Sequence, residues 1–294
     1  MSDVTATSGH SRYGLTDEDL AAKPTVYRDG LLEGHVVLIT GGGGGFGRGM
    51  ATLYARLGAK VVIASRNEDK LLAARDSIAS CTGREIEART LNIRDPDSVS
   101  AALDWAFERH GRLDSLINNA GGQFPAEAID LSPNGWHAVI DTNLNGTWWM
   151  MQGAAQRWRD RGQPGNIINI VMPINRGLPQ VVHSAAARAG VIFAAKSVST
   201  AWAPLQIRVN CIAPGPIESL GLRNYPEELV RRIHLGNPMK AMGDVWDVAQ
   251  ACVYLEAPTG KFITGEVLTI DGGMQQWGGS WPLGVPDYFN VAGA

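Results

Sequence analysis

The sequence predicts a single doubly wound α/β domain, in which a parallel sheet of about seven strands carries helices on both faces. Two observations support this fold class. Short apolar segments alternate along the chain with longer segments in which apolar residues recur at helical spacing. This alternation runs from about residue 34 to residue 274 without a linker. Because parallel strands need crossover connections, usually helices, the pattern is typical of repeated βαβ units in one sheet.

The first strand and helix set the pattern for the rest. The segment His35–Thr40 (HVVLIT) is apolar and ends in glycines, and apolar residues at helical spacing follow it in 47–58. The other expected strands are about 60–65, 86–92, 113–118, 166–171, 206–212 and 266–270. The other expected helices are about 67–80, 96–110, 134–161, 184–203 and 244–257.

The remaining segments lie around this domain of residues 34–274. Residues 1–33 are polar and mixed, and we expect an N-terminal arm on the surface. The segment at about 214–243 is longer than a normal connection and contains its own short helical stretch. Because it follows the carboxyl end of a strand, we expect a lobe that covers a substrate. The tail 275–294 either packs over that region, packs on a neighbouring subunit, or forms a loose terminus.

Composition excludes several classes of function. The 294 residues are 45% hydrophobic and 19% charged with a net charge of -3, which is typical of a soluble globular protein and gives no basic surface for nucleic acid. The three cysteines are far apart and no two histidines have metal-ligand spacing, so we expect neither disulfides nor a metal site. With no signal peptide and no apolar run of membrane-spanning length, the expected location is cytoplasmic, without a membrane span.

A glycine-rich turn, Thr40–Gly47, joins the first strand to the first helix. This context is typical of a Rossmann-type dinucleotide site, where the backbone approaches a pyrophosphate and the helix N-terminus supplies donors. The second strand ends in Ser65 and Arg66, and no acidic residue occurs before Glu68. An acid here would favour a free ribose 2′-hydroxyl, whereas Arg66 can pair with a 2′-phosphate. The sequence therefore favours NADP(H), with NAD(H) as the alternative if Arg66 faces solvent.

Several motifs resemble the short-chain dehydrogenase/reductase family. The turn Thr40–Gly47 is similar to its TGxxxGxG motif, Asn118–Gly121 to its NNAG motif, Pro214-Gly215 to its PG motif, and Ile270–Gly273 to its closing DGG. Asn143 matches an asparagine of its long helix. The resemblance, which covers about residues 34–274, implies an NAD(P)-dependent oxidoreductase. The residues implied in cofactor binding are Thr40, Gly41, Gly45, Phe46, Gly47, Ser65, Arg66, Asn92, Asn119, Ala120, Gly121, Arg188, Pro214 and Gly215.

The catalytic positions depart from this family. Its tyrosine acts as the acid or base, and a lysine four residues later lowers the pKa of that tyrosine. Here Ser184 and Arg188 occupy the two positions, and the family's serine falls near Val171 and Met172. A serine hydroxyl is a far weaker acid than a phenol of pKa about 10, and a guanidinium does not pass protons near neutral pH. The pair can still donate a hydrogen bond and hold positive charge, which suits stabilisation of an enolate.

Two branches of the family resemble this chain. The 2,4-dienoyl-CoA reductases also have a serine in a segment similar to 181–191 (VVxSAxAxAGV) and share Ala64-Ser65-Arg66. They differ in having a lysine at Arg188, an asparagine at Gln123 and, in the mitochondrial form, a tyrosine near Pro173. Citronellol/citronellal dehydrogenases resemble the segments 27–31 and 183–190, arginine included.

We therefore expect Ser184, Arg188, Asn143, Gln123 and His183 to be the catalytic residues. His183 could relay a proton or simply face solvent or core. The leading hypothesis is an NADP(H)-dependent reductase of an activated C=C or C=O bond in a small apolar substrate, such as an enoyl or dienoyl thioester of CoA, or an enone. The alternatives are a terpenoid-type alcohol or aldehyde dehydrogenase and a cofactor-binding pseudoenzyme. The resemblance also implies a homo-oligomer, a dimer or tetramer, with the tryptophans Trp148, Trp149 and Trp202 packing near an interface.

Overall fold

A computed structural model describes residues 14–225 and 227–277, and it confirms the predicted seven-stranded parallel sheet. The strand order is β3-β2-β1-β4-β5-β6-β9, and every neighbouring pair is parallel. The strands are β1 (Val36–Thr40), β2 (Lys60–Ser65), β3 (Ile86–Thr90), β4 (Ser115–Asn118), β5 (Gly165–Ile170), β6 (Ile207–Pro214) and β9 (Val267–Ile270). The order reverses between β1 and β4, which places a crevice at the carboxyl ends of these two strands.

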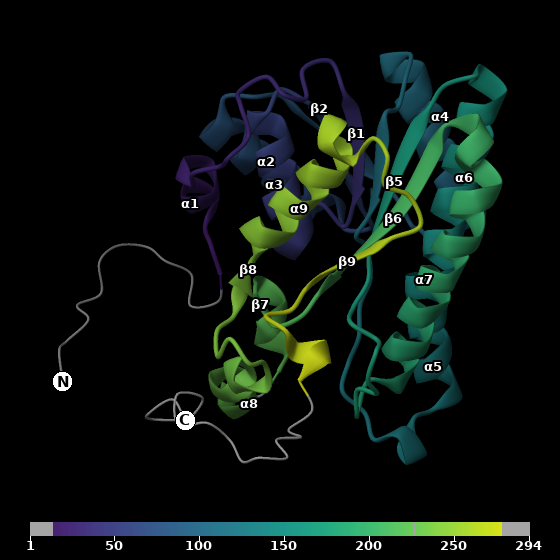
Figure 1. Ribbon diagram of the computed structural model, residues 1–294. Helices are drawn as coiled ribbons and strands as arrows, with labels where there is room; N and C mark the ends of the chain where they lie inside the picture. The colour runs from purple at the N-terminus through teal and green to yellow at the C-terminus, as the bar shows by residue number, and fades with distance from the viewer. Residues whose placement is uncertain (1–13, 226, 278–294) are drawn as a thin grey trace.

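Helices cover both faces of the sheet (Figure 1). One face carries α2 (Gly45–Arg56), α3 (Glu68–Thr82) and α9 (Val245–Glu256), and the other carries α4 (Pro96–His110), α6 (Thr147–Arg161) and α7 (Val182–Trp202). The central strand β1 is buried throughout, with Val37 and Ile39 in one core cluster and Val36 and Leu38 in the other. Burial on both faces explains why this strand is a continuous apolar run rather than an alternating one.

Helix α1 (Asp17–Ala22) lies within the segment that the sequence predicts to be a polar arm. It begins with a capping box in which the Thr16 hydroxyl accepts from the Asp19 backbone N–H and the Asp19 carboxylate accepts from that of Thr16. Leu20 and Leu32 are buried in the same core cluster as α2 and α9. The segment 14–33 therefore packs on one helical layer through these two leucines. Single apolar residues in a polar run give no periodicity, which is why the sequence does not predict this helix.

The helix expected over 134–161 begins as α5 (Pro133–Ile140), passes through a π-helical turn (Asp141–Gly146) and continues as α6. The π-turn contains Asn143. Such turns insert an extra residue and change the direction in which a side chain points, and they occur often at functional sites.

The predicted substrate lobe, 214–243, contains β7 (Ile217–Glu218) and α8 (Glu227–Arg232) and ends at the start of β8 (Gly243–Asp244). Strands β7 and β8 pair with each other as a separate two-stranded sheet. Figure 1 shows α8 below the strands of the main sheet, with α5 also low but on the other side of the picture. The 3-10 helices are η1 (Ala128–Asp130), η3 (Ala203–Leu205), η4 (Leu220–Asn224), η5 (Ile233–Gly236), η6 (Pro258–Gly260) and η7 (Met274–Gln276).

The tail is described only at its start. The Gln275 backbone N–H donates to the Asp271 carboxylate at 2.8 Å, which ties this point to the end of β9. The rest of the tail, 278–294, lies outside the described residues, so its placement stays a prediction. Within the described ranges, no helix has both the length and the apolar character that crossing a bilayer requires.

Candidate cofactor and active site

The turn after β1 and the turn after β4 are joined by the side chains of Thr40 and Asn119. The Thr40 hydroxyl accepts hydrogen bonds from the backbone N–H groups of Asn119 and Ala120, each at 3.0 Å. In return, the Asn119 side-chain amide donates to the Thr40 carbonyl oxygen at 2.9 Å. Thr40 is 1% exposed. The two turns are thus held as one rigid unit at the crevice between β1 and β4.

The turn also brings the N-terminus of α2 close to this unit. A Cβ atom at Gly47 would overlap the Gly41 carbonyl oxygen and lie 2.7 Å from the Asn119 amide nitrogen, so only glycine fits there. The N-cap of α2 is Gly44, which has no capping side chain, and the first turn contains no acidic residue. The backbone N–H groups of that turn and the positive end of the helix are therefore free to bind an anion. This geometry fits the pyrophosphate of a dinucleotide.

A cavity of about 600 Å³, which we call the cofactor cleft, opens beside this turn. It is lined by Gly41, Gly43, Gly44, Ser65, Arg66, Asn67 and Lys70. Two of these side chains are cationic and none is a carboxylate, so the cleft favours an anionic ligand. The sequence predicts Ser65 and Arg66 but misses Lys70, which lies in the first turn of α3, four residues after Arg66. The position of Lys70 in the first turn of the helix that follows this strand is the signal that could have identified it.

The other predicted cofactor residues do not line this cleft. Gly45 is the first residue of α2, and Phe46 is partly buried against the core. Asn92 follows β3, and its side-chain oxygen accepts from the Arg94 backbone N–H at 3.3 Å, so the amide helps to close its own turn. Pro214 ends β6, and the Gly215 N–H bonds the Ile270 carbonyl at 2.8 Å.

Arg188 lies against Gly121, the last residue of the β4 motif. A Cβ atom at Gly121 would overlap the guanidinium group, so glycine is required for this approach. One guanidinium nitrogen of Arg188 donates to the Ile170 carbonyl oxygen at 2.7 Å, at the end of β5. Burial lowers the pKa of Arg188 to about 10, which still leaves it charged at neutral pH. The structure therefore places a fixed positive charge beside the carboxyl ends of β4 and β5.

Asn143 is fully buried and makes both of its amide hydrogen bonds with one residue, Gly122. Its side-chain oxygen accepts from the Gly122 N–H at 2.9 Å, and its side-chain nitrogen donates to the Gly122 carbonyl at 2.8 Å. The amide is therefore committed to the backbone of the β4 loop. This geometry gives Asn143 a positioning role rather than direct contact with a substrate.

Ser184, the residue in the position of the family tyrosine, is 1% exposed near the start of α7. Its hydroxyl contacts the sulfur of Met172 at 3.8 Å. The family's serine is expected near Val171 and Met172, so this contact joins two of the positions that the resemblance singles out. A thioether is a weak acceptor, so the Ser184 proton is available to a stronger one.

His183 is fully buried, and neither of its ring nitrogens has a hydrogen-bond partner among the described residues. The ring lies edge-on against Phe124, with centroids 4.6 Å apart and an interplanar angle of 81°. Leaving a buried polar group unpaired costs roughly 1–3 kcal/mol, so this imidazole lacks a partner that a ligand or a water would supply. Phe124 is 39% exposed and separates His183 from solvent on that side.

Gln123 contacts a residue that the sequence analysis missed. Its side-chain nitrogen donates to the phenol oxygen of Tyr225 at 2.8 Å. Tyr225 lies in the lobe between η4 and α8, 102 residues away along the chain. No spacing in the sequence brings the two together, and the only signal is that Tyr225 is the one tyrosine of the lobe.

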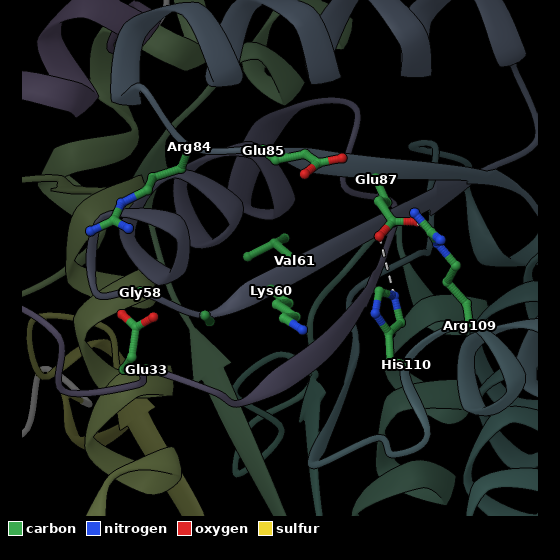
Figure 2. Close-up of a pocket in the computed structure, with 10 residues that line it drawn as sticks. Glu33, Gly58, Lys60, Val61, Arg84, Glu85, Glu87, Arg109 and His110 are labelled. Carbon is green, nitrogen blue, oxygen red and sulfur yellow. Dashed lines mark hydrogen bonds and ion pairs between the residues drawn. The ribbon is translucent and has the colours of Figure 1, made fainter.

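A second cavity of about 360 Å³ lies at the other end of the strands, beside the amino ends of β2 and β3 (Figure 2). Figure 2 shows acidic and basic side chains together there, with His110 paired to Glu87 at 3.4 Å. Ligands of open parallel sheets bind at the carboxyl ends of the strands, and Glu87 here already pairs with Arg109 at 3.2 Å. Groups of acidic, histidine or cysteine side chains that could hold a metal ion are absent among the described residues.

Comparison with known proteins gives one consistent family. The family model described as enoyl-(acyl carrier protein) reductase matches residues 42–275. A probable 2,4-dienoyl-CoA reductase of Bacillus subtilis is 36% identical over 257 residues, which is 86% of this chain and 100% of that protein. A citronellol catabolism dehydrogenase, AtuB, of Pseudomonas aeruginosa has a TM-score of 0.77 at 30% identity, covering 86% of this chain and 99% of that one. An actinorhodin polyketide ketoreductase solved with NADPH has a TM-score of 0.78 at 26% identity, covering 83% and 98%.

Proposed function

The chain belongs to the short-chain dehydrogenase/reductase family, and we propose that it is an NADP(H)-dependent reductase of the activated C=C bond in an apolar acyl thioester. The observation that carries the proposal is the combination of an intact cofactor cleft with Ser184 and Arg188 in place of the tyrosine and lysine. Such a site can hold a dinucleotide and stabilise negative charge, but it lacks a phenol beside the cofactor position on α7. Similarity to a 2,4-dienoyl-CoA reductase supports the same reaction class.

The residues around the crevice fit an NADP(H) molecule. The N-terminus of α2 would bind the pyrophosphate, and Arg66 with Lys70 would bind the 2′-phosphate of the adenosine ribose. Arg188 would hold the nicotinamide ribose from its place against Gly121. When bound, the cofactor supplies a hydride.

The chain's own contribution to the reaction is electrostatic. A hydride that adds to the remote carbon of a conjugated thioester moves an electron pair towards the thioester oxygen, which becomes an enolate. The Ser184 hydroxyl would donate a hydrogen bond to this oxygen, and the charge of Arg188 would lower its energy. The enolate carbon then takes one proton from solvent, so that one hydride and one proton are added in total.

Oxidation of a simple alcohol makes a different demand. A base must remove the hydroxyl proton, and neither a serine hydroxyl nor a guanidinium does so near neutral pH. The chemistry available on α7 therefore favours conjugated substrates, whose intermediate carries its charge on a delocalised oxygen.

The test is NADPH consumption by the purified protein with a 2,4-dienoyl-CoA. We expect turnover, and we expect Ser184→Ala to lower kcat on the order of 10²-fold because one oxyanion donor is lost. Ser197→Ala is the matched control, because the Ser197 hydroxyl lies on the same helix but is exposed and bonds the Phe193 carbonyl. Equal rates for Ser184→Ala and the wild-type protein would overturn the role of this hydroxyl.

A second candidate is a terpenoid-type alcohol or aldehyde dehydrogenase, which the likeness to AtuB favours. In that reaction His183, buried next to Ser184, would serve as the base. NADP+ reduction with citronellol but no turnover of dienoyl thioesters would support this candidate over the first. NADPH binding without turnover of enoyl-CoAs, enones or terpenoid alcohols would instead identify a cofactor-binding pseudoenzyme.

A further inference from the structure

We infer that Tyr225 of the substrate lobe supplies the phenol hydroxyl that α7 lacks, and that it donates a hydrogen bond to the carbonyl oxygen of the substrate. This inference rests on the proposed reduction of a conjugated thioester. It assigns a function to the contact between Tyr225 and Gln123, which joins the lobe to the loop after β4.

The direction of that hydrogen bond leaves the phenol proton available. The Gln123 side-chain nitrogen donates and the Tyr225 oxygen accepts, at 2.8 Å, so the bond occupies a lone pair of the oxygen. A phenol that accepts one hydrogen bond can donate another at the same time. Hydrogen bonds in such a chain polarise one another, so the bond from Gln123 strengthens the phenol as a donor.

Hydrogen bonds to the neighbouring backbone fix the positions of both Gln123 and Tyr225. Gln123 follows Gly122, whose N–H and carbonyl groups are both bound by Asn143. On the lobe, the Tyr225 N–H donates to the Leu222 carbonyl at 3.1 Å, and Leu222 is 7% exposed. The phenol is therefore presented from two anchored segments, which is the arrangement that oriented donors require.

The loop that contacts this phenol also contacts the charge that the reaction needs. Gln123 lies two residues after Gly121, against which the Arg188 guanidinium packs. Phe124, the next residue, contacts His183, which adjoins Ser184. A substrate oxygen held between α7 and the lobe would meet Ser184 from one side and Tyr225 from the other.

The chemistry of the ligand follows from this pair of donors. Two neutral hydroxyls and one nearby guanidinium suit an uncharged carbonyl that gains negative charge, such as the oxygen of an α,β-unsaturated thioester. Because Tyr225 is on the lobe, the second donor is in place only when the lobe lies against the β4 loop. Tyr225 thus couples substrate recognition by the lobe to stabilisation of the enolate.

The experiment compares Tyr225→Phe with wild-type protein, with NADPH and a 2,4-dienoyl-CoA as the probes. We expect kcat to fall by about 10- to 10²-fold with little change in the Kd of NADPH, because one donor to the enolate is lost and the cofactor cleft is untouched. In the complex with NADP+, the absorbance of the bound dienoyl thioester should shift to longer wavelength in the wild-type protein. That shift should be smaller in Tyr225→Phe, because a donor to the carbonyl polarises the conjugated system. Tyr254→Phe is the matched control, since Tyr254 is a partly exposed tyrosine on α9.

A double-mutant cycle separates this role from a structural one. If Gln123 acts through Tyr225, then Gln123→Ala combined with Tyr225→Phe should be no slower than Tyr225→Phe alone. Additive losses, or an unchanged kcat and unchanged spectrum in Tyr225→Phe, would overturn the inference and leave the proposed function standing. A wild-type protein with neither turnover nor a spectral shift would overturn the proposed function, and the inference with it.

Discussion

Removing both cations of the cofactor cleft should abolish the proposed preference for NADPH over NADH. In Arg66→Ala combined with Lys70→Ala, the adenosine ribose would still meet Ser65 and the glycine turn, but a 2′-phosphate would meet no positive charge in the lining. A dianionic phosphate about 4 Å from a cation near the surface gains roughly 2 kcal/mol at the dielectric constant of water. Screening and side-chain ordering reduce the sum for two cations to about 3 kcal/mol, or roughly 10²-fold in the ratio of the two dissociation constants.

The assay is a fluorescence titration of each variant with NADPH and with NADH at low and high salt. We expect the Kd of NADPH to rise by roughly 10²-fold in the double variant, and the Kd of NADH to change by less than about threefold. Higher salt should weaken NADPH binding to the wild-type protein more than to the double variant. Arg75→Ala is the control, because Arg75 lies on α3 but pairs with Asp76. A wild-type protein that binds both cofactors equally would refute the assignment of the 2′-phosphate to this cleft.

Two further predictions concern the active site and the core. Gly121→Ala should displace the Arg188 guanidinium and raise the Kd of NADPH by about tenfold, measured by the same titration, and an unchanged Kd would show that Arg188 does not hold the cofactor. His35 bonds the buried carboxylate of Glu256 at 2.9 Å, and this hydrogen bond raises the pKa of His35. The stabilisation of the folded protein by protonated His35 is therefore complete below the ordinary histidine pKa of about 6.5, and it is lost as pH rises through the raised pKa. The measurement is the free energy of unfolding in urea of the wild-type protein minus that of His35→Gln. This difference should fall between pH 6 and pH 8 by under about 1 kcal/mol, because the His35 side chain is 37% exposed. A rise in the difference over that range would contradict the pairing.

The fold and the glycine turn after β1 could be predicted because their signals are local. The strand β1 is an unbroken apolar run, and the glycines that follow it within eight residues determine both the turn and the start of α2. The departure at Ser184 and Arg188 is also visible in one helical segment, and the structure places both near the carboxyl end of β5. In each case the residues that act together are close in sequence or follow successive strands of the same sheet.

What the sequence does not reveal depends on long-range contacts. Gln123 could be predicted as a polar residue of the β4 loop, but its partner Tyr225 comes from an irregular lobe with no period to follow. The match of Asn143 to the long-helix asparagine is visible in the sequence, but the pairing of its amide with Gly122 across 21 residues is not, because it depends on the same kind of long-range contact. The complete burial of His183 is likewise a property of packing, since its position at the start of a helix is compatible with solvent or core.

The residues of the site are better suited to stabilising negative charge than to transferring protons. Arg188 keeps its positive charge near neutral pH even though burial lowers its pKa to about 10, and Asn143 commits its amide to the backbone. The hydroxyls of Ser184 and Tyr225 are donors that can stabilise a developing oxyanion without losing their protons. A site of this kind lowers the energy of a delocalised enolate, which persists until water protonates its carbon. It stabilises an alkoxide less well, because an alkoxide carries its charge on one strongly basic oxygen that must be protonated as it forms. This difference favours a conjugated thioester as the substrate class.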